Sequence, residues 1–183
     1  MRKLLLVATS MILFLLSHSV WADNYSDTIK VFKYSDVVNK YFSRSYGYAV
    51  FPTIGKGGVG IGGAHGKGQV YRYGKVTGTT SMTQLTIGLQ LGGQAFSQVI
   101  FFEDKRAYKD FTSGNFEFGA QATAIAITSG AAAQVGTTGT SAGAGNKQTK
   151  SGYTKGMIVF THAKGGLMYE ATLGGQKYSF KPK

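Results

Sequence analysis

Residues 47–68 read GYAVFPTIGKGGVGIGGAHGKG, and we refer to them as the glycine-rich segment. Nine of the 22 residues are glycine, and the two charged side chains, Lys56 and Lys67, are both basic. Val59 and Ile61 alternate with glycines, which is the period of a β-strand. Glycine inside a strand permits sharp curvature, a bulge or the close approach of another backbone. The segment therefore predicts strands that are bent and closely packed.

A nucleotide-binding loop is the competing interpretation of the same glycines. Gly55, Gly57 and Gly60 satisfy the pattern G-x-G-x-x-G. That fingerprint must follow a buried strand and open a helix, whereas here the chain continues into the strand-like residues Gln69–Tyr73. No phosphate loop of the form G-x-x-x-x-G-K-[ST] occurs in the segment. The pattern favours a structural role for the glycines.

The first 22 residues have the features of a secretory leader. Arg2 and Lys3 precede an apolar run, Leu4–Leu16, and Ala22 ends a small-residue cleavage pattern. The run has 13 residues, whereas a membrane span needs about 20. Cysteine is absent, and secretion without disulfides suits a bacterial envelope better than an extracellular space. We therefore expect a periplasmic protein, in which residues 23–46 form an N-terminal helical segment and residues 47–183 a glycine-rich β domain.

The chain is strongly basic. It has 20 Lys and Arg against 8 Asp and Glu, so loss of two basic residues with the leader leaves a formal charge of +10 (18 − 8). Such a charge indicates anionic partners, although a basic surface can also serve solubility alone. In a periplasm the candidates are anionic lipid head groups, lipopolysaccharide phosphates and acidic glycans, and nucleic acid is not expected.

Residues 23–44 are predicted to be helical in two pieces, with Ser35 or Asp36 as the N-cap of the second. Its apolar face either covers the core or dips into a membrane interface. The residues considered for membrane contact are Phe32, Tyr41 and Phe42.

From Tyr48 onward the pattern has period two. Residues 84–90 are the clearest strand, with Leu85, Ile87 and Leu89 predicted to face the core. A helix is predicted from the N-cap Asp104 to Phe111, ended by Gly114. Further strands are expected at residues 99–102, 115–128, 153–163, 167–173 and 177–180, and residues 129–151 are a long small-residue segment. The predicted fold class is α+β, a predominantly antiparallel curved sheet or barrel-like sandwich with short N-terminal helices and one internal helix.

Residues able to carry catalysis are few. The chain after the leader has two histidines, His65 and His162, and eight carboxylates. No G-x-S-x-G elbow and no H-E-x-x-H metal motif is present. We expect no enzyme activity, no metal and no cofactor, and a hydrolase using His65 or His162 is the minority hypothesis. His65 is either a turn residue or, with Lys67, a phosphate ligand.

Four segments in order resemble the SYLF lipid-binding domain family, in its bacterial secreted branch. They are GYAVFPTIGKGGVGIGGAHGKG at 47–68, SMTQLTIGLQLGGQAFSQVIFF at 81–102, FEFGAQATA at 116–124 and KGGLMYEATLGGQKYSF at 164–180. The resemblance covers the chain from about residue 33 to its end. It implies phospholipid binding, with phosphoinositides favoured by eukaryotic members, some of which also engage actin. Lys56, His65 and Lys67 match the family's glycine-rich motif, and Arg72 follows in the same strand.

The sequence thus predicts a non-enzymatic periplasmic protein, peripheral at a membrane, that recognises anionic phospholipid head groups through Lys56, His65, Lys67 and Arg72. The alternative is a structural or interaction module that binds another envelope protein or itself.

Overall fold

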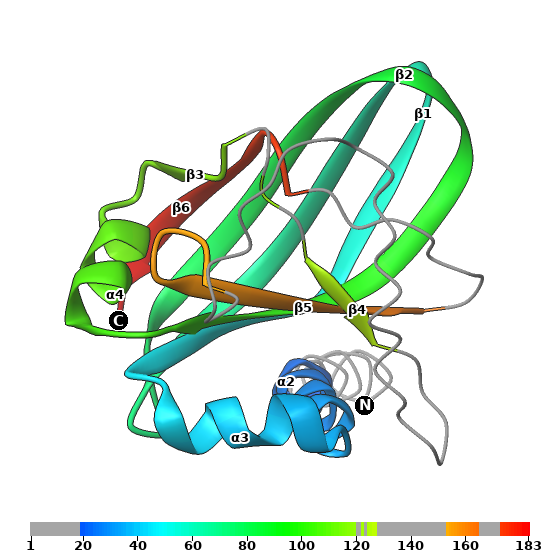
Figure 1. The fold of residues 1–183 in the computed structure, drawn as a ribbon. Coiled ribbons are helices and arrows are strands. Elements are labelled where there is room, and N and C mark those ends of the chain that lie inside the picture. The colour runs from blue at the N-terminus through cyan, green and yellow to red at the C-terminus, as the bar shows by residue number, and fades with distance from the viewer. Residues whose placement is uncertain (1–18, 120–121, 123, 128–152, 165–172) are drawn as a thin grey trace, which may run out of the picture.

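The computed structural model describes residues 19–119, 122, 124–127, 153–164 and 173–183. They form an α+β fold, a curved and mostly antiparallel sheet closed into a half-barrel with three helices, which confirms the predicted fold class (Figure 1). The elements in chain order are α2 (Ser19–Lys33), α3 (Asp36–Arg44), β1 (Gly47–Arg72), β2 (Lys75–Phe102), α4 (Lys105–Thr112), β3 (Phe116–Glu117), β4 (Ile125–Ile127), β5 (Met157–Ala163) and β6 (Gln176–Pro182).

One long hairpin supplies most of the sheet. β1 and β2 have 26 and 28 residues and are antiparallel from Gly47↔Phe102 to Arg72↔Lys75. They are joined by Tyr73 and Gly74, which have φ values of 50° and 75°. Positive φ at both residues is typical of the two-residue type I′ turn, whose twist matches that of paired strands.

The hairpin bends near its middle, which divides the sheet into two arms. The register slips between Val59↔Leu91 and Ile61↔Ile87. The first arm contains residues 61–72 of β1, and there β2 pairs with β6 through residues 78–84. The second arm contains residues 47–59 of β1, and there β2 pairs with β5 through residues 96–102. β3 extends the first arm beyond β6, and β4 runs parallel to β5 in the second. Figure 1 shows β1 and β2 rising together and curving over at this bend.

The glycines let the two arms cross closely. A Cβ atom on Gly68 would lie 2.7 Å from the carbonyl oxygen of Val50, and one on Gly66 would lie 2.6 Å from Cγ1 of Ile54. Real Cβ atoms essentially never approach other heavy atoms so closely, so both sites need glycine. The prediction that the glycine-rich segment serves close backbone packing is confirmed at these positions.

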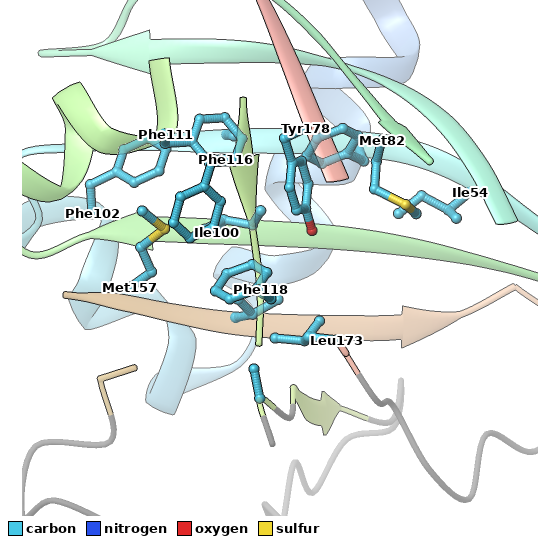
Figure 2. Close-up of a cluster of buried hydrophobic side chains, with 14 of the residues drawn as sticks. Ile54, Met82, Ile100, Phe102, Phe111, Phe116, Phe118, Met157, Leu173 and Tyr178 are labelled. Atoms are coloured by element: carbon cyan, nitrogen blue, oxygen red, sulfur yellow. The ribbon is translucent and has the colours of Figure 1, made fainter. Parts of the chain in front are cut away.

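The concave side of the half-barrel holds the larger core. Buried aromatic and aliphatic side chains of both arms meet there with Phe111 of α4, as Figure 2 shows. α4 begins as predicted, because the side chain of Asp104 accepts a hydrogen bond from the backbone N–H of Ala107 at 2.8 Å. It ends before Gly114, whose φ is 87°.

A polar group lies within this core. Gln98 donates through Nε2 to the hydroxyl of Tyr178 at 2.8 Å and to Oε1 of Gln176 at 3.3 Å. Gln176 donates in turn to Gln84, whose own amide nitrogen donates to the carbonyl of Gly174 at 2.8 Å. Burial raises the pKa of Tyr178 well above its usual range, so the phenol stays neutral.

This network reverses the prediction for the first two residues of the strand at 84–90. Gln84 points inward with 5% of its surface exposed, whereas Leu85, predicted to face the core, is 75% exposed. At these two positions the phase is opposite to the prediction, because the inward position is taken by a glutamine with hydrogen-bond partners inside the barrel.

Helices α2 and α3 cover the convex side of the second arm. Val38 is fully buried, and Val37, Tyr41 and Phe42 pack on the same cluster as Val50 and Phe101. α3 follows Ser35 as predicted, although the Ser35 hydroxyl makes no capping hydrogen bond. No helix of the described residues is long and apolar enough to span a membrane.

Other predicted elements differ from the structure. The predicted strand at 115–128 is present as the two short strands β3 and β4, and its alternation holds for the buried Phe116, Phe118 and Ala122 but ends before Ala126, which is exposed. Residues 1–18 of the leader and the whole segment 129–151 lie outside the described residues. Of the predicted strand at 167–173, only residue 173 is described.

Candidate functional site

The convex face of the first arm is polar and basic. Along β1 residues 64, 66, 68 and 70 are buried, whereas His65 and Lys67 are exposed. The register carries this face across β2 to β6 in three rows: His65, Thr83 and Lys177; Lys67, Ser81 and Ser179; Gln69, Thr79 and Lys181. We call these nine residues the outer face.

An open depression of about 930 Å³ lies on the outer face. Tyr25 of α2 forms one wall, and the remaining lining comes from three strands: Lys67, Gly68, Gln69, Thr79, Thr80, Ser81, Ser179, Phe180 and Lys181. The depression therefore combines two lysines with a row of hydroxyl groups, and Tyr25 of α2 lies at its edge.

Hydroxyl groups join the strands at the centre of the depression. The Oγ atoms of Ser81 and Ser179 are 2.6 Å apart, and either can be the donor. Thr80 Oγ1 donates to the carbonyl oxygen of Ser179 at 2.7 Å. Because a hydroxyl has one proton and two lone pairs, the Ser81–Ser179 pair keeps one proton that is free to meet an anion.

The positive charge on this face is little compensated. β1, β2 and β6 contain no carboxylate. Within the described part of the chain, Lys67 and Lys181 have no ion-pair partner. Lys177 pairs with Glu117 of β3 at 3.6 Å, but both side chains are well exposed and such pairs are weak.

The structure brings together two of the four predicted head-group residues. His65 and Lys67 share the outer face, and His65 lies within a strand rather than in a turn. Lys56 lies in the other arm, on the side of β1 taken by the buried Ile54. Arg72 lies at the hairpin turn, with its guanidinium carbon 5.5 Å and 5.2 Å from the rings of Tyr46 and Tyr73.

Lys177 and Lys181 are basic residues of the face that sequence reasoning missed. The signal was present in KYSFK at 177–181, where Lys177, Ser179 and Lys181 alternate with the aromatic Tyr178 and Phe180. A strand of that pattern puts both lysines on one side. Their pairing with Thr83 and Thr79 of β2, about a hundred positions earlier, could not be inferred from spacing.

The residues predicted to contact a membrane pack against the sheet. Phe32 has no exposed surface and meets the ring of His162 edge-on at 6.5 Å. Tyr41 lies tilted against Phe101 with ring centroids 5.6 Å apart, and Phe42 meets Phe101 edge-on at 4.8 Å. As placed, Phe32 has no surface left for a bilayer, because the apolar face of these helices covers the sheet.

Two ionisable groups near the helices favour their neutral forms. Burial raises the pKa of Tyr71 to about 12, helped by nearby Tyr48 and Tyr25, and its hydroxyl donates to Oε1 of Gln69 at 2.7 Å. The pKa of His162 is lowered by burial and then by Lys164. Ser97 donates to the His162 carbonyl oxygen at 3.3 Å. In the described residues no three His, Cys, Asp or Glu side chains gather as metal ligands.

The fold and this face define an α+β half-barrel domain with a basic, hydroxyl-lined surface. The family model Ysc84, described as Las17-binding protein actin regulator, matches residues 83–182. Because the match covers more than half of the 183 residues, the chain belongs to this family, the SYLF domains, which are associated with lipid binding and actin regulators. A search of curated proteins found no relative. The match includes Lys177 and Lys181 and begins after His65 and Lys67.

Proposed function

We propose that this protein binds the head groups of anionic phospholipids at a membrane surface in the periplasm, without catalysing a reaction. The observation that carries the proposal is the outer face, on which Lys67 and Lys181 flank the Ser81–Ser179 hydroxyl pair. The family's association with lipid supports it. The periplasmic location rests on the leader pattern of residues 1–22 and the absence of cysteine.

The chemistry of the face suits a phosphate diester. Lysine ammonium groups bind phosphate as point charges, and hydroxyls add short hydrogen bonds to its oxygens. A lysine near an anionic membrane contributes about 1 kcal/mol. Lys67, Lys177 and Lys181 together therefore support weak binding that is sensitive to salt.

Vesicle sedimentation tests the proposal. The full chain is mixed with vesicles of phosphatidylcholine alone or with phosphatidylglycerol at low salt. We expect recovery with the anionic vesicles only, decreasing as salt is raised. The double variant Lys67→Glu, Lys181→Glu should bind at least about tenfold more weakly, because two contacts of about 1 kcal/mol each become repulsive.

The matched control is Lys105→Glu, Lys109→Glu, which changes the net charge equally but alters exposed lysines of α4. Its binding should fall far less. Equal losses in the two double variants would show that overall charge, and not the outer face, attracts the lipid.

A protein-binding function is the second candidate, because the family description names a protein partner. For this chain that partner is another envelope protein or a second copy. Crosslinking in intact cells and mass spectrometry of lipids extracted from the natively purified protein separate the two. A dominant protein adduct with no co-purifying lipid favours this candidate over lipid binding.

A further inference from the structure

The bend of the β1–β2 hairpin exposes aliphatic side chains. Ile61 is 67% exposed and Leu85 is 75% exposed. The other large hydrophobic residues with such exposure in the described chain are Tyr34 and Tyr73, which carry hydroxyls. Exposure of isoleucine and leucine to water is unfavourable, so an exposed pair of them at the bend indicates a binding role and not a contribution to folding.

The two side chains lie on the same side of the sheet as the outer face. Gly63 pairs with Leu85, and Ile61 pairs with residue 87 of β2. Ile61 and Leu85 are therefore diagonal neighbours, which aliphatic side chains can bridge. From Ile61 to Lys67 the strand alternates without a break: residues 61, 65 and 67 are exposed, and residues 62, 64 and 66 are buried. Ile61 and its neighbour Leu85 therefore lie on the same side of the sheet as His65 and Lys67.

The rows that contain basic residues lie next to this aliphatic pair along the strands. The row of His65, Thr83 and Lys177 lies one pleat repeat, or roughly 7 Å, from the row of Leu85, and the row of Lys67 lies roughly 13 Å away. Apolar groups of peripheral proteins enter about 5–10 Å into the boundary between head groups and acyl chains. Lysines one and two rows behind the aliphatic pair then reach the level of the phosphates.

We propose that the bend of the hairpin is the membrane-docking element, with Ile61 and Leu85 entering the interface of an anionic bilayer and Lys177 and Lys67 meeting its phosphates. This inference rests on the proposed function and adds the orientation of the protein on the membrane. An anionic bilayer fits because it offers apolar and negatively charged layers in the order in which the face presents apolar and positive groups.

The first test is the variant Ile61→Ser, Leu85→Ser on vesicles of phosphatidylcholine with phosphatidylglycerol. We expect at least about a tenfold loss of binding with an unchanged melting temperature, since both side chains are exposed. The control Tyr34→Ser, Tyr73→Asn removes two exposed aromatic residues elsewhere, and asparagine tolerates the turn conformation at 73. It should bind within about twofold of the unmodified chain.

The results separate the two proposals. If the unmodified chain ignores anionic vesicles, the proposed function fails and the docking inference fails with it. If it binds and the serine variant binds equally, lipid binding stands and docking through the bend is overturned.

A second measurement reports insertion directly. The chain has no cysteine, so Leu85→Cys and Tyr73→Cys each accept a single environment-sensitive label. We expect the label at 85 to shift to the blue on anionic vesicles and to be quenched by doxyl lipids, while the label at 73 stays in water. A label at 85 that leaves water only when copies of the chain associate, without vesicles, assigns the bend to self-contact and overturns the inference.

Discussion

Gly68 shows how strongly one residue of the glycine-rich segment is constrained. A methyl group there would meet the Val50 carbonyl oxygen at 2.7 Å and Cδ1 of Phe51 at 2.8 Å. The first contact is with backbone that is held in the hairpin, so it cannot be relieved by a side-chain rotation. The requirement for glycine at 68 therefore comes from a crossing between distant parts of one strand.

We predict that Gly68→Ala lowers the free energy of unfolding by about 2 kcal/mol, within the range of 1–3 kcal/mol for an overpacked core. Urea titration followed by circular dichroism measures it. Gly55→Ala is the control, because a Cβ atom at Gly55 has no neighbour within 4 Å. It should change stability by no more than about 0.5 kcal/mol. Equal losses in both variants would mean that the crossing is not the cause.

At the same scale, sequence reasoning found what glycine does but not which side the polar residues take. The glycines of 47–68 were predicted to allow close packing, and Gly66 and Gly68 do so. Leu85 was predicted to be buried and is exposed, while its neighbour Gln84 is buried. A hydrophobic pattern assigns leucine to the core by default, and the partners that draw Gln84 inward come from a strand about ninety residues later.

Among the elements, α4 has the clearest start signal. The Asp104 carboxylate accepts from the N–H of Ala107, so it satisfies one of the unpaired donors of the first turn. Arg106 forms ion pairs with Asp104 and with Asp110, but all three side chains are exposed and these pairs contribute little to stability.

We predict that Asp104→Ala lowers the free energy of unfolding by about 1 kcal/mol through loss of the cap, whereas Asp104→Asn, which keeps an acceptor, changes it by a few tenths. Chemical denaturation of the two variants beside the unmodified chain gives the comparison. A loss in the asparagine variant as large as that in the alanine variant would assign the effect to the negative charge instead of the hydrogen bond.

Helix boundaries could be predicted because their signals are local. Asp104 and Gly114 each act within one turn of α4, the helix they limit, whereas Ser35 precedes α3 without a side-chain cap. The strands were harder, since β2 runs without a break through Gly92 and Gly93, which lie between the predicted strands at 84–90 and 99–102. Pairing with Gly57 and Gly58 of β1 keeps the strand extended at these two glycines.

At the scale of the whole molecule, the described residues form two apolar clusters that share one sheet. Val50, Val99 and Phe101 contribute to the cluster under the helices, and their neighbours Phe51, Ile100 and Phe102 contribute to the cluster inside the half-barrel. Strands β1, β2 and β5 contribute side chains to both clusters, so loss of one cluster removes a wall of the other.

We predict a single cooperative unfolding transition. Far-ultraviolet circular dichroism, which reports the helices and sheet, and the near-ultraviolet tyrosine signal should give coincident thermal curves. Calorimetric and van't Hoff enthalpies should agree. Two separated transitions would show that the helical layer over the second arm unfolds independently of the barrel interior.

At this scale the sequence predicted the α+β class and the basic character, which follow from period and composition. The outer face could not be predicted, because it joins His65 and Lys67 to Lys177 and Lys181 through β2, and register is a property of the folded sheet.

The bond between Ser81 and Ser179 connects residues 98 positions apart in the chain. A chain that emerges from the ribosome, or threads through an export channel, presents the long hairpin well before the strand that completes the depression. During that interval β2 has an open edge along residues 78–84, the stretch later covered by β6. The site proposed for lipid head groups is therefore completed last, when β6 pairs with β2, and the part of the chain that carries Lys67 emerges before the surface is complete.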